Sequence, residues 1–183
     1  GYVDKYTGDE IMALFGAKAA SEVDTQRAIN TAMLMLKKLK HFNTILKESK
    51  KYKNLDIDLS IRIGINTGMV TTGAVGKERE GDYTAYGDAV NLASRMESNA
   101  PINRIMLPED TMDLVKDYFI FKDHGFVEVK GKRKPVSVFL IESKKDLSMN
   151  ISTPFIGRKK EISILSKIYT NQIKEIQNNT FNK

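Results

Sequence analysis

The segment from Ile57 to Ile65 constrains the fold more than any other part of this sequence. Its odd-numbered positions are all Ile or Leu, whereas the positions between them are Asp, Ser, Arg and Gly. Successive side chains of a β-strand point to opposite faces, so this strict period of two predicts a strand with one buried face. The turn signal Asn66-Thr67-Gly68 follows it, and we expect a second strand over 69–72 that folds back to form a hairpin.

Helices and further strands are predicted on both sides of this segment. Residues 22–49 carry apolar side chains at helical spacing with lysines on the other face, which is typical of an amphipathic helix packed on a core. A second helix is expected over 88–98, and Pro108-Glu109-Asp110 places proline and acids at the start of a third. The remaining predicted strands are 2–3, 11–15, 104–107, 119–121, 126–129 and 136–141. This order predicts an α+β fold of antiparallel hairpins backed by helices.

The composition excludes several kinds of chemistry. The chain has 183 residues, no cysteine and two histidines, His41 and His124, which lie far apart. Disulfides, thiolate nucleophiles and cysteine metal sites are therefore excluded, and histidine-based metal or triad chemistry is disfavoured. No apolar run approaches the roughly 18 residues that a membrane helix needs, so we expect no membrane span in this segment and a cytoplasmic location.

The net charge of +6 raises the question of nucleic-acid binding. The lysines gather in residues 37–53, in 130–134 and towards the C-terminus, with few aromatic side chains between them. A solvated basic surface explains the same charge, so we expect no nucleic-acid partner; such a partner would show binding that weakens steeply with salt.

The sequence divides into three parts. Residues 1–142 hold the predicted helices and strands. Residues 143–154 are polar and lack periodicity, and they are expected to form a linker, whereas residues 155–183 have a helical tendency. The chain begins with Gly in the middle of an alternating pattern, which indicates a piece of a longer protein.

Three short segments concentrate side chains that suit chemistry. Asp4 to Glu10 places a lysine and carboxylates around a tight turn, where a fixed carboxylate can bind a hard cation such as Mg²⁺. Asn91 and Arg95 are four residues apart, so on a helix they would point toward a common target such as a phosphoryl group. Residues 129–134 form a basic loop that suits a polyphosphate. Taken alone, the first segment is better explained as an ordinary turn, the Asn–Arg pair as exposed helix surface, and the basic loop could simply face water.

Together and in this order, these segments resemble the class III adenylyl and guanylyl cyclases. The resemblance runs from Gly1 to about Ile141, and its motifs are Val3–Gly16, Ile63–Gly68, Gly87–Glu97 and Val129–Lys132. It implies the class III cyclase fold, which is a ferredoxin-like palm of antiparallel hairpins backed by helices. It also implies an adenylate cyclase of intracellular signalling, which converts ATP to cyclic AMP and pyrophosphate.

The resemblance assigns a role to six residues. These residues lie on the predicted N-terminal hairpin, in and just before the second predicted helix, and in the basic loop. Asp9 matches the second of the family's two metal-binding aspartates, Lys5 and Thr84 match the residues that recognise the purine, Asn91 matches the residue that orients the ribose, Arg95 matches the one that stabilises the transition state, and Lys130 matches the lysine on the terminal phosphates.

The residue types at two of these positions imply the choice of base. Many relatives have aspartate where this chain has Thr84. A threonine at this position makes the chain similar to the subgroup of soluble, often bicarbonate-responsive adenylyl cyclases. Guanylyl members usually carry glutamate and cysteine at the positions of Lys5 and Thr84. The resemblance therefore implies ATP as the substrate.

The resemblance further implies two divalent metal ions, Mg²⁺ or Mn²⁺, and a homodimer. In this family the metal aspartates and the Asn–Arg pair come from opposite subunits, and this chain carries Asp9 together with Asn91 and Arg95, so a two-fold axis would create two equivalent sites. One departure is that the family's first strand, with the first metal aspartate, would lie upstream of Gly1. We therefore expect residues 1–183 alone to be inactive or nearly so.

Two alternatives stay open at this point. The chain could be a catalytically inactive, nucleotide-binding regulatory domain, which would lack the upstream aspartate. Residues 154–162 resemble the opening of the ATPase module that follows cyclase domains in large multidomain regulators, and an ordinary linker helix explains them as well.

Overall fold

The computed structural model describes residues 1–17, 19–52, 55, 57–75, 82–129, 131–132, 134–146, 158, 160–161 and 163–169. The chain divides into two compact units, residues 1–146 and 147–183. In the second unit, residues 160–161 and 163–169 are helical. None of the helices in the described ranges is long and apolar enough to cross a membrane.

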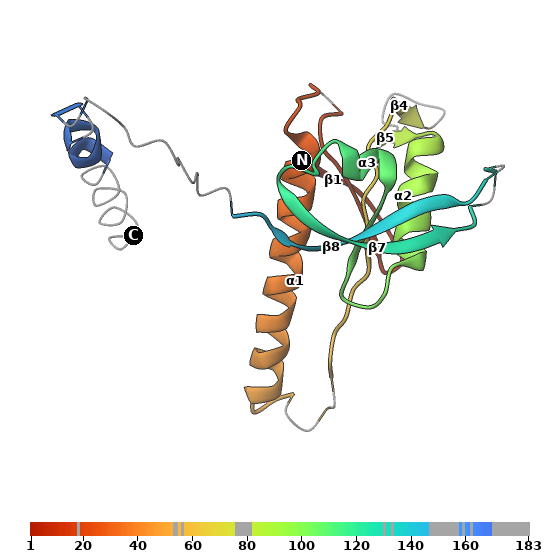
Figure 1. Cartoon of the computed structure of the whole chain (residues 1–183). Coiled ribbons are helices and arrows are strands. Elements are labelled where there is room, and N and C mark those ends of the chain that lie inside the picture. Colours follow the sequence, from red (N-terminus) through yellow and green to blue (C-terminus); the bar gives the residue numbers. More distant parts are fainter. Residues whose placement is uncertain are drawn as a thin grey trace. The chain divides into compact units, whose positions relative to one another are not determined.

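The first unit is a mixed α+β structure (Figure 1). Its elements follow one another as β1 (Tyr2–Thr7), β2 (Glu10–Leu14), α1 (Asp24–Glu48), β3 (Ile63–Gly64), β4 (Thr71–Val75), β5 (Asp82–Tyr86), α2 (Asp88–Asn99), β6 (Ile105–Pro108), α3 (Glu109–Asp113), β7 (Phe119–Val127) and β8 (Val136–Lys144). The predicted fold class is confirmed. β5 was not among the predicted strands, and β8 continues through Lys144 into the segment that was expected to be a linker.

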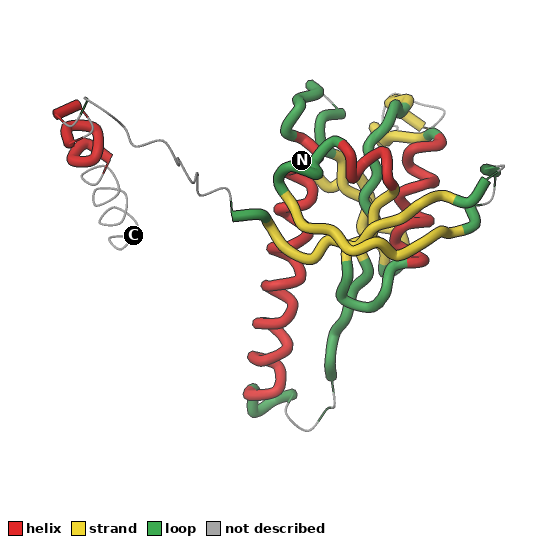
Figure 2. The backbone as a smooth tube through the Cα atoms, in the orientation of Figure 1, coloured by secondary structure: helices red, strands yellow, loops and turns green. Residues whose placement is uncertain are grey.

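A four-stranded sheet with the order β3-β6-β8-β7 forms the centre of this unit (Figure 2). β3 and β6 are parallel, whereas β6 with β8 and β8 with β7 are antiparallel. β1 with β2 and β4 with β5 form two separate antiparallel hairpins. β7 is one strand where two were predicted, because an irregularity between Asp123 and Phe126 interrupts its register without ending it; Gly125 lies there with a φ of 80°.

The central sheet separates two hydrophobic clusters. Ile105 and Leu107 of β6 belong to the same cluster as Ile29 of α1, whereas Met106 between them belongs to the cluster of Met96 in α2. Alternate residues of a strand point to opposite faces, so α1 and α2 cover opposite faces of this sheet. All four β6 residues are buried, as expected for a strand between two layers.

The long strand predicted over 57–65 is wrong in its extent, since only Ile63–Gly64 form a regular strand. The preceding residues bind side chains instead of a neighbouring strand. The amide of Asn43 in α1 donates to the Leu59 carbonyl (2.7 Å) and accepts from the Leu59 N–H (3.0 Å). Asn103 Oδ1 accepts from the Ile61 N–H at 3.1 Å. The alternating pattern therefore marks an extended segment that packs beside α1.

The predicted hairpin between this segment and residues 69–72 is also wrong. β3 pairs with β6, and β4 pairs with β5. The residues after β3 are held by other elements: Asn66 Nδ2 donates to the Ala89 carbonyl at the start of α2 (2.9 Å), and the Thr67 N–H donates to Thr111 Oγ1 in α3 (2.9 Å). These bonds fix the chain after β3 between two helices, so it does not fold back on β3.

Thr111 is the centre of this small polar network. It is 0% exposed, and its hydroxyl donates to Asn66 Oδ1 at 3.2 Å while it accepts from the Thr67 N–H. The hydroxyl of Thr67 in turn lies 3.0 Å from that of Thr25 in α1. The network joins the residues after β3 to α1, α2 and α3, because Asn66 also binds the first turn of α2.

Gly64 brings β3 directly against α2. A Cβ atom at this position would lie 2.2 Å from the Ala93 carbonyl oxygen and 2.2 Å from the Glu97 nitrogen, both in the backbone of α2. Glycine in a strand interior often marks a place where another backbone approaches closely. The glycine in the alternating segment is therefore a contact point between the sheet and the helix.

We expect Gly64→Ala to lower the free energy of unfolding by more than about 3 kcal/mol, the upper end of ordinary overpacking, because backbone atoms cannot move aside as a flexible side chain would. Urea unfolding followed by circular dichroism measures it. Gly125→Ala is the matched control: nothing lies within 4 Å of its added Cβ, and its φ of 80° alone should cost about 1–2 kcal/mol. Equal losses in the two variants would contradict the contact at Gly64.

Thr111→Val should destabilise the unit by about 1–3 kcal/mol, because the isosteric side chain leaves the part-buried Thr67 N–H and Asn66 Oδ1 without their partner. Thr111→Ser keeps the hydroxyl and loses only a methyl group, which should cost about 1 kcal/mol. The two variants are compared by urea unfolding. A serine variant as unstable as the valine variant would show that the methyl group, and not the hydrogen bonds, stabilises this position.

Candidate active site

The β1–β2 hairpin holds Asp9 in a tight turn. Thr7 pairs with Glu10, so Gly8 and Asp9 alone form the connection. Gly8 has a φ of 63°, which a two-residue hairpin turn requires and which glycine adopts without strain. Asp9 is exposed. Its carboxylate is therefore held by a rigid turn and is accessible to a ligand.

The middle of β1 contacts β5 through a side-chain hydrogen bond. The Thr84 hydroxyl donates to Asp4 Oδ2 at 2.5 Å, within the range of a charge-assisted O–H···O⁻ bond. The pairing of β1 with β2 shifts its register between Val3 and Lys5, so Asp4 lies in a β-bulge. Lys5 is the exposed residue next to it. The structure thus brings two predicted purine-recognition residues, Lys5 and Thr84, onto neighbouring strands.

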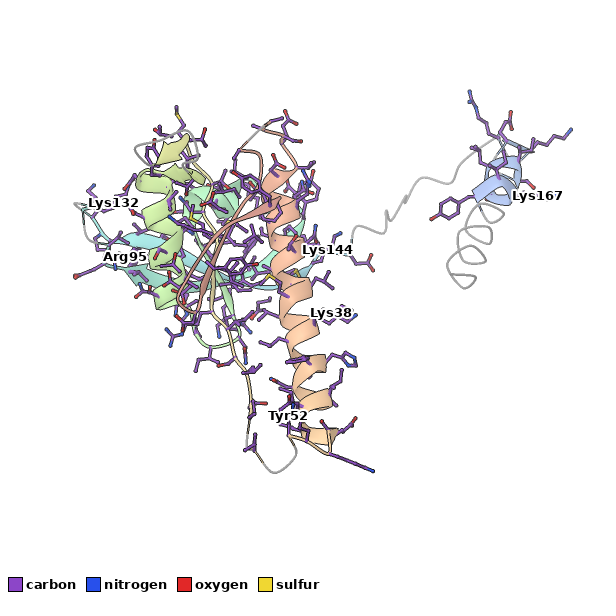
Figure 3. The ribbon with its side chains drawn as sticks, turned by 180° about the vertical axis from the view of Figure 1, so that it is seen from behind. Lys38, Tyr52, Arg95, Lys132, Lys144 and Lys167 are labelled. Atoms are coloured by element: carbon purple, nitrogen blue, oxygen red, sulfur yellow. The ribbon has the colours of Figure 1, made fainter. Side chains whose placement is uncertain are left out.

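Helix α2 presents Asn91 and Arg95 to solvent. The helix starts after Gly87, whose φ is 139°, and the Asn91 N–H donates to the Gly87 carbonyl at 3.2 Å in its first turn. Both side chains are exposed, whereas the neighbouring Met96 is fully buried. Figure 3 shows Arg95 at the surface of this helix. Because they are four residues apart, Asn91 and Arg95 share the outward face, as predicted from their spacing.

The loop between β7 and β8 reaches the start of α2. Lys132 Nζ lies 2.7 Å from Asp88 Oδ2, and both side chains are partly or largely exposed, so this ion pair contributes little stability (Figure 3). It does, however, place Lys132 of the basic loop beside the helix that carries Asn91. Lys130, the residue predicted to bind the terminal phosphates, lies outside the described residues, and its role stays a prediction.

The predicted site residues form two groups within one chain. Lys5, Asp9 and Thr84 belong to the hairpins, and Asn91 and Arg95 belong to α2. In the described parts of the chain, no hydrogen bond or ion pair joins the side chains of one group to those of the other. The same parts contain no cluster of three or more His, Cys, Asp or Glu side chains able to hold a metal ion.

No individual role was predicted for Asp4 from the sequence. Its partner Thr84 lies 80 residues away, and the bulge that contains Asp4 has no local signal in the sequence. The available signal was its position next to Lys5, which placed it in the cluster of charged residues around the turn. Its contact with a predicted purine-recognition residue makes it part of the candidate site.

A protein-family model covers the residues of both groups. The model of the adenylate and guanylate cyclase catalytic domain matches residues 3–143. This range includes both hairpins, α2 and the central sheet, and therefore every predicted site residue.

Curated relatives of both nucleotide specificities are similar to the chain. An adenylate cyclase of Mycobacterium tuberculosis is 32% identical over 140 residues, which are 76% of this chain and 29% of the relative. A membrane guanylyl cyclase of Dictyostelium discoideum is 27% identical over 180 residues, which are 98% of this chain and 11% of the relative. The chain thus spans less than a third of the length of these relatives.

Solved structures of cyclases share the fold. The adenylyl cyclase CyaB from P. aeruginosa superposes with a TM-score of 0.70 at 33% identity, covering 79% of this chain and 72% of the other. The guanylyl cyclase Cya2 gives a TM-score of 0.72 at 29% identity, covering 81% and 73%. The family match, the fold and the motifs together show that the chain belongs to the class III adenylyl and guanylyl cyclase catalytic-domain family.

Proposed function

We propose that this domain is an adenylate cyclase, which converts ATP to 3′,5′-cyclic AMP and pyrophosphate. The family supports nucleotide cyclisation, and its members include enzymes for both ATP and GTP. The choice of ATP rests on the residue types at the two purine-recognition positions, Lys5 and Thr84, and the hydrogen bond from Thr84 to Asp4, the residue before Lys5, brings their strands into contact. Because ATP is an intracellular metabolite, we expect the reaction to take place in the cytoplasm.

The chemistry of the two side chains favours adenine. Adenine has a hydrogen-bond acceptor at ring position one and an amino donor at position six. The Lys5 ammonium group can only donate and suits the ring nitrogen, while the Thr84 hydroxyl can accept from the amino group. Guanine has a proton on the ring nitrogen and an acceptor oxygen at position six. A site built from such hydrogen bonds rejects a mismatched base edge strongly.

The residues of α2 suit the reacting part of the nucleotide. The ribose 3′-oxygen attacks the α-phosphorus, the new oxygen–phosphorus bond closes the cyclic phosphate, the bond to the β-phosphate oxygen breaks, and the 3′-hydroxyl proton leaves to solvent. Asn91 would orient the ribose, and the Arg95 guanidinium would stabilise charge that builds up on the α-phosphoryl group. Lys130 would bind the terminal phosphates. Both α2 side chains are exposed, so a nucleotide can reach them.

Asp9 fits part of a divalent-metal site, because it is a carboxylate held on a rigid, exposed turn. The other oxygen ligands would come from the nucleotide phosphates, from water and from the aspartate expected upstream of Gly1. Bound Mg²⁺ or Mn²⁺ would supply Lewis-acid chemistry and neutralise phosphate charge. The second candidate function is a nucleotide-binding regulatory domain without turnover, which would lack the family's first metal-binding aspartate.

A homodimer would complete the site by combining the hairpin residues of one subunit with the α2 residues of its partner. Apolar side chains exposed around the hairpins support this assembly: Tyr6 is 72% and Met69 96% exposed, and Ile11 and Tyr86 are also exposed. Exposed groups of apolar side chains often mark association surfaces. A two-fold axis would then generate two equivalent sites.

The shared site predicts that two inactive variants restore activity when combined. Asp9→Ala and Arg95→Ala should each abolish cyclic AMP formation in protein extended upstream of Gly1, because each damages both sites of its own homodimer. Random mixing should recover about a quarter of the wild-type activity, since half of the dimers carry one intact site. Cyclic AMP is measured with Mg²⁺ and with Mn²⁺.

Two controls accompany this mixing experiment. Arg62→Ala removes another exposed arginine, outside the site, and should leave activity unchanged. The heterodimers should be isolated through two different affinity tags. If isolated heterodimers remain inactive, the subunits do not share a site. If the wild-type extended protein binds ATP and forms no cyclic AMP, the regulatory alternative is correct.

The purine assignment predicts a change of base preference. Lys5→Glu together with Thr84→Cys should lower catalytic efficiency on ATP and raise the relative use of GTP. Lys5→Glu should cause most of this change, because glutamate replaces a donor with an acceptor that suits the guanine ring N–H. Steady-state kinetics with both nucleotides measure it for the wild type and each single variant. A wild type that prefers GTP, or a preference that Lys5→Glu leaves unchanged, would contradict the assignment.

A further inference from the structure

The hydrogen bond between Thr84 and Asp4 determines where the hydroxyl proton of Thr84 points. Oγ1 of Thr84 donates to Oδ2 of Asp4 at 2.5 Å. A carboxylate only accepts hydrogen bonds, and a threonine hydroxyl has a single proton. While this bond is formed, Thr84 therefore has only lone pairs left for any other partner.

Two features of Asp4 favour keeping this bond. Both side chains are half-buried, so water competes less for the carboxylate than it would at the surface. The other carboxylate oxygen, Oδ1, is buried and has no hydrogen-bond partner among the described residues. If the Thr84 hydroxyl turned away, Oδ2 would lose the hydrogen bond that the structure shows, which is unfavourable for a half-buried charged group.

The fold places Asp4 for this contact. The bulge between Val3 and Lys5 adds a residue to β1 opposite β2, and bulges bend a strand and redirect its side chains. Asp4 thereby contacts β5, while Lys5 next to it remains exposed. One charged residue thus binds within the protein, and its neighbour stays available for a ligand.

We propose that Asp4 is a positioning residue that determines base specificity through Thr84. By holding the hydroxyl proton, Asp4 makes Thr84 a pure acceptor, which matches the 6-amino group of adenine and repels the 6-oxygen of guanine. This rests on the proposed function, in which Thr84 faces position six of the purine. A threonine without such a partner could rotate to donate to guanine and would discriminate little. When it is bonded to Asp4, Thr84 accepts a hydrogen bond from the base and donates none to it, as a carboxylate would.

The test measures nucleotide affinity, so it does not depend on turnover. Three 3′-deoxynucleoside triphosphates, which lack the attacking oxygen, are titrated by calorimetry: one with adenine, one with guanine and one with unsubstituted purine, which has no group at position six. Asp4→Ala should lower the preference for adenine over guanine by about tenfold, because the freed hydroxyl can then donate to the 6-oxygen. Affinity for the unsubstituted purine should change by less than about twofold, a result that general damage to the site would not give.

Two further variants separate this role from a structural one. In a Thr84→Val background, adding Asp4→Ala should change the preference no further, because Asp4 acts through the hydroxyl that valine lacks. Asp113→Ala, which removes an exposed aspartate paired with Lys116 at 3.1 Å, should leave the preference unchanged. If the Asp4→Ala variant is unstable, the comparison of Thr84→Val with the wild type still tests whether the hydroxyl selects adenine.

The proposal is overturned if Asp4→Ala keeps the wild-type preference, if it weakens all three nucleotides equally, or if the wild type does not prefer adenine. Cyclic AMP formation is assayed separately with ATP. Wild-type protein that prefers adenine in binding and forms no cyclic AMP would refute the enzyme activity and leave the role of Asp4 intact.

Discussion

The backbone contact between β3 and α2 at Gly64 determines where the exposed residues of α2 lie. Because no side chain separates the two elements, the inward face of α2 sits on the sheet and carries Met96 into the core. The outward face then has to present Asn91 and Arg95 to solvent. The hydrogen bond of Asn66 to the Ala89 carbonyl holds the first turn of the same helix. If α2 carries the catalytic residues, as proposed, it needs this kind of support, because small displacements of catalytic side chains reduce the rate strongly.

The sequence predicted the helices and the fold class well, because these depend on local patterns. The apolar spacing of residues 22–49 and 88–98 predicted α1 and α2 to within two residues at each end. Pairing between strands was predicted less well. The alternation over 57–65 correctly indicated extended backbone, but it could not reveal that Asn43 binds Leu59 in place of a neighbouring strand. The partner of β3 is β6, and nothing local in the sequence encodes that choice.

The candidate site shows the same division between local and distant information. The turn at Gly8 and Asp9, and the shared face of Asn91 and Arg95, follow from spacing alone and are present in the structure. The contact between Asp4 and Thr84 depends on a bulge and on the approach of two hairpins, so it required the structure. This contact alters the interpretation of Thr84: a hydroxyl that the sequence presents as either donor or acceptor is committed as a donor to the protein.

The parallel pairing of β3 with β6 has a consequence for how this domain folds. Residues on these neighbouring segments that bind each other, such as Ile61 and Asn103, are 42 positions apart in the chain. A parallel pair cannot form through a short turn. The entropy cost of closing the long loop comes before the strand hydrogen bonds can stabilise the pair. The intervening loop contains β4, β5 and α2, and with them Thr84, Asn91 and Arg95. We therefore expect these residues to reach their final positions late, when this non-local loop closes, and conditions that slow the closure to delay the candidate site more than α1.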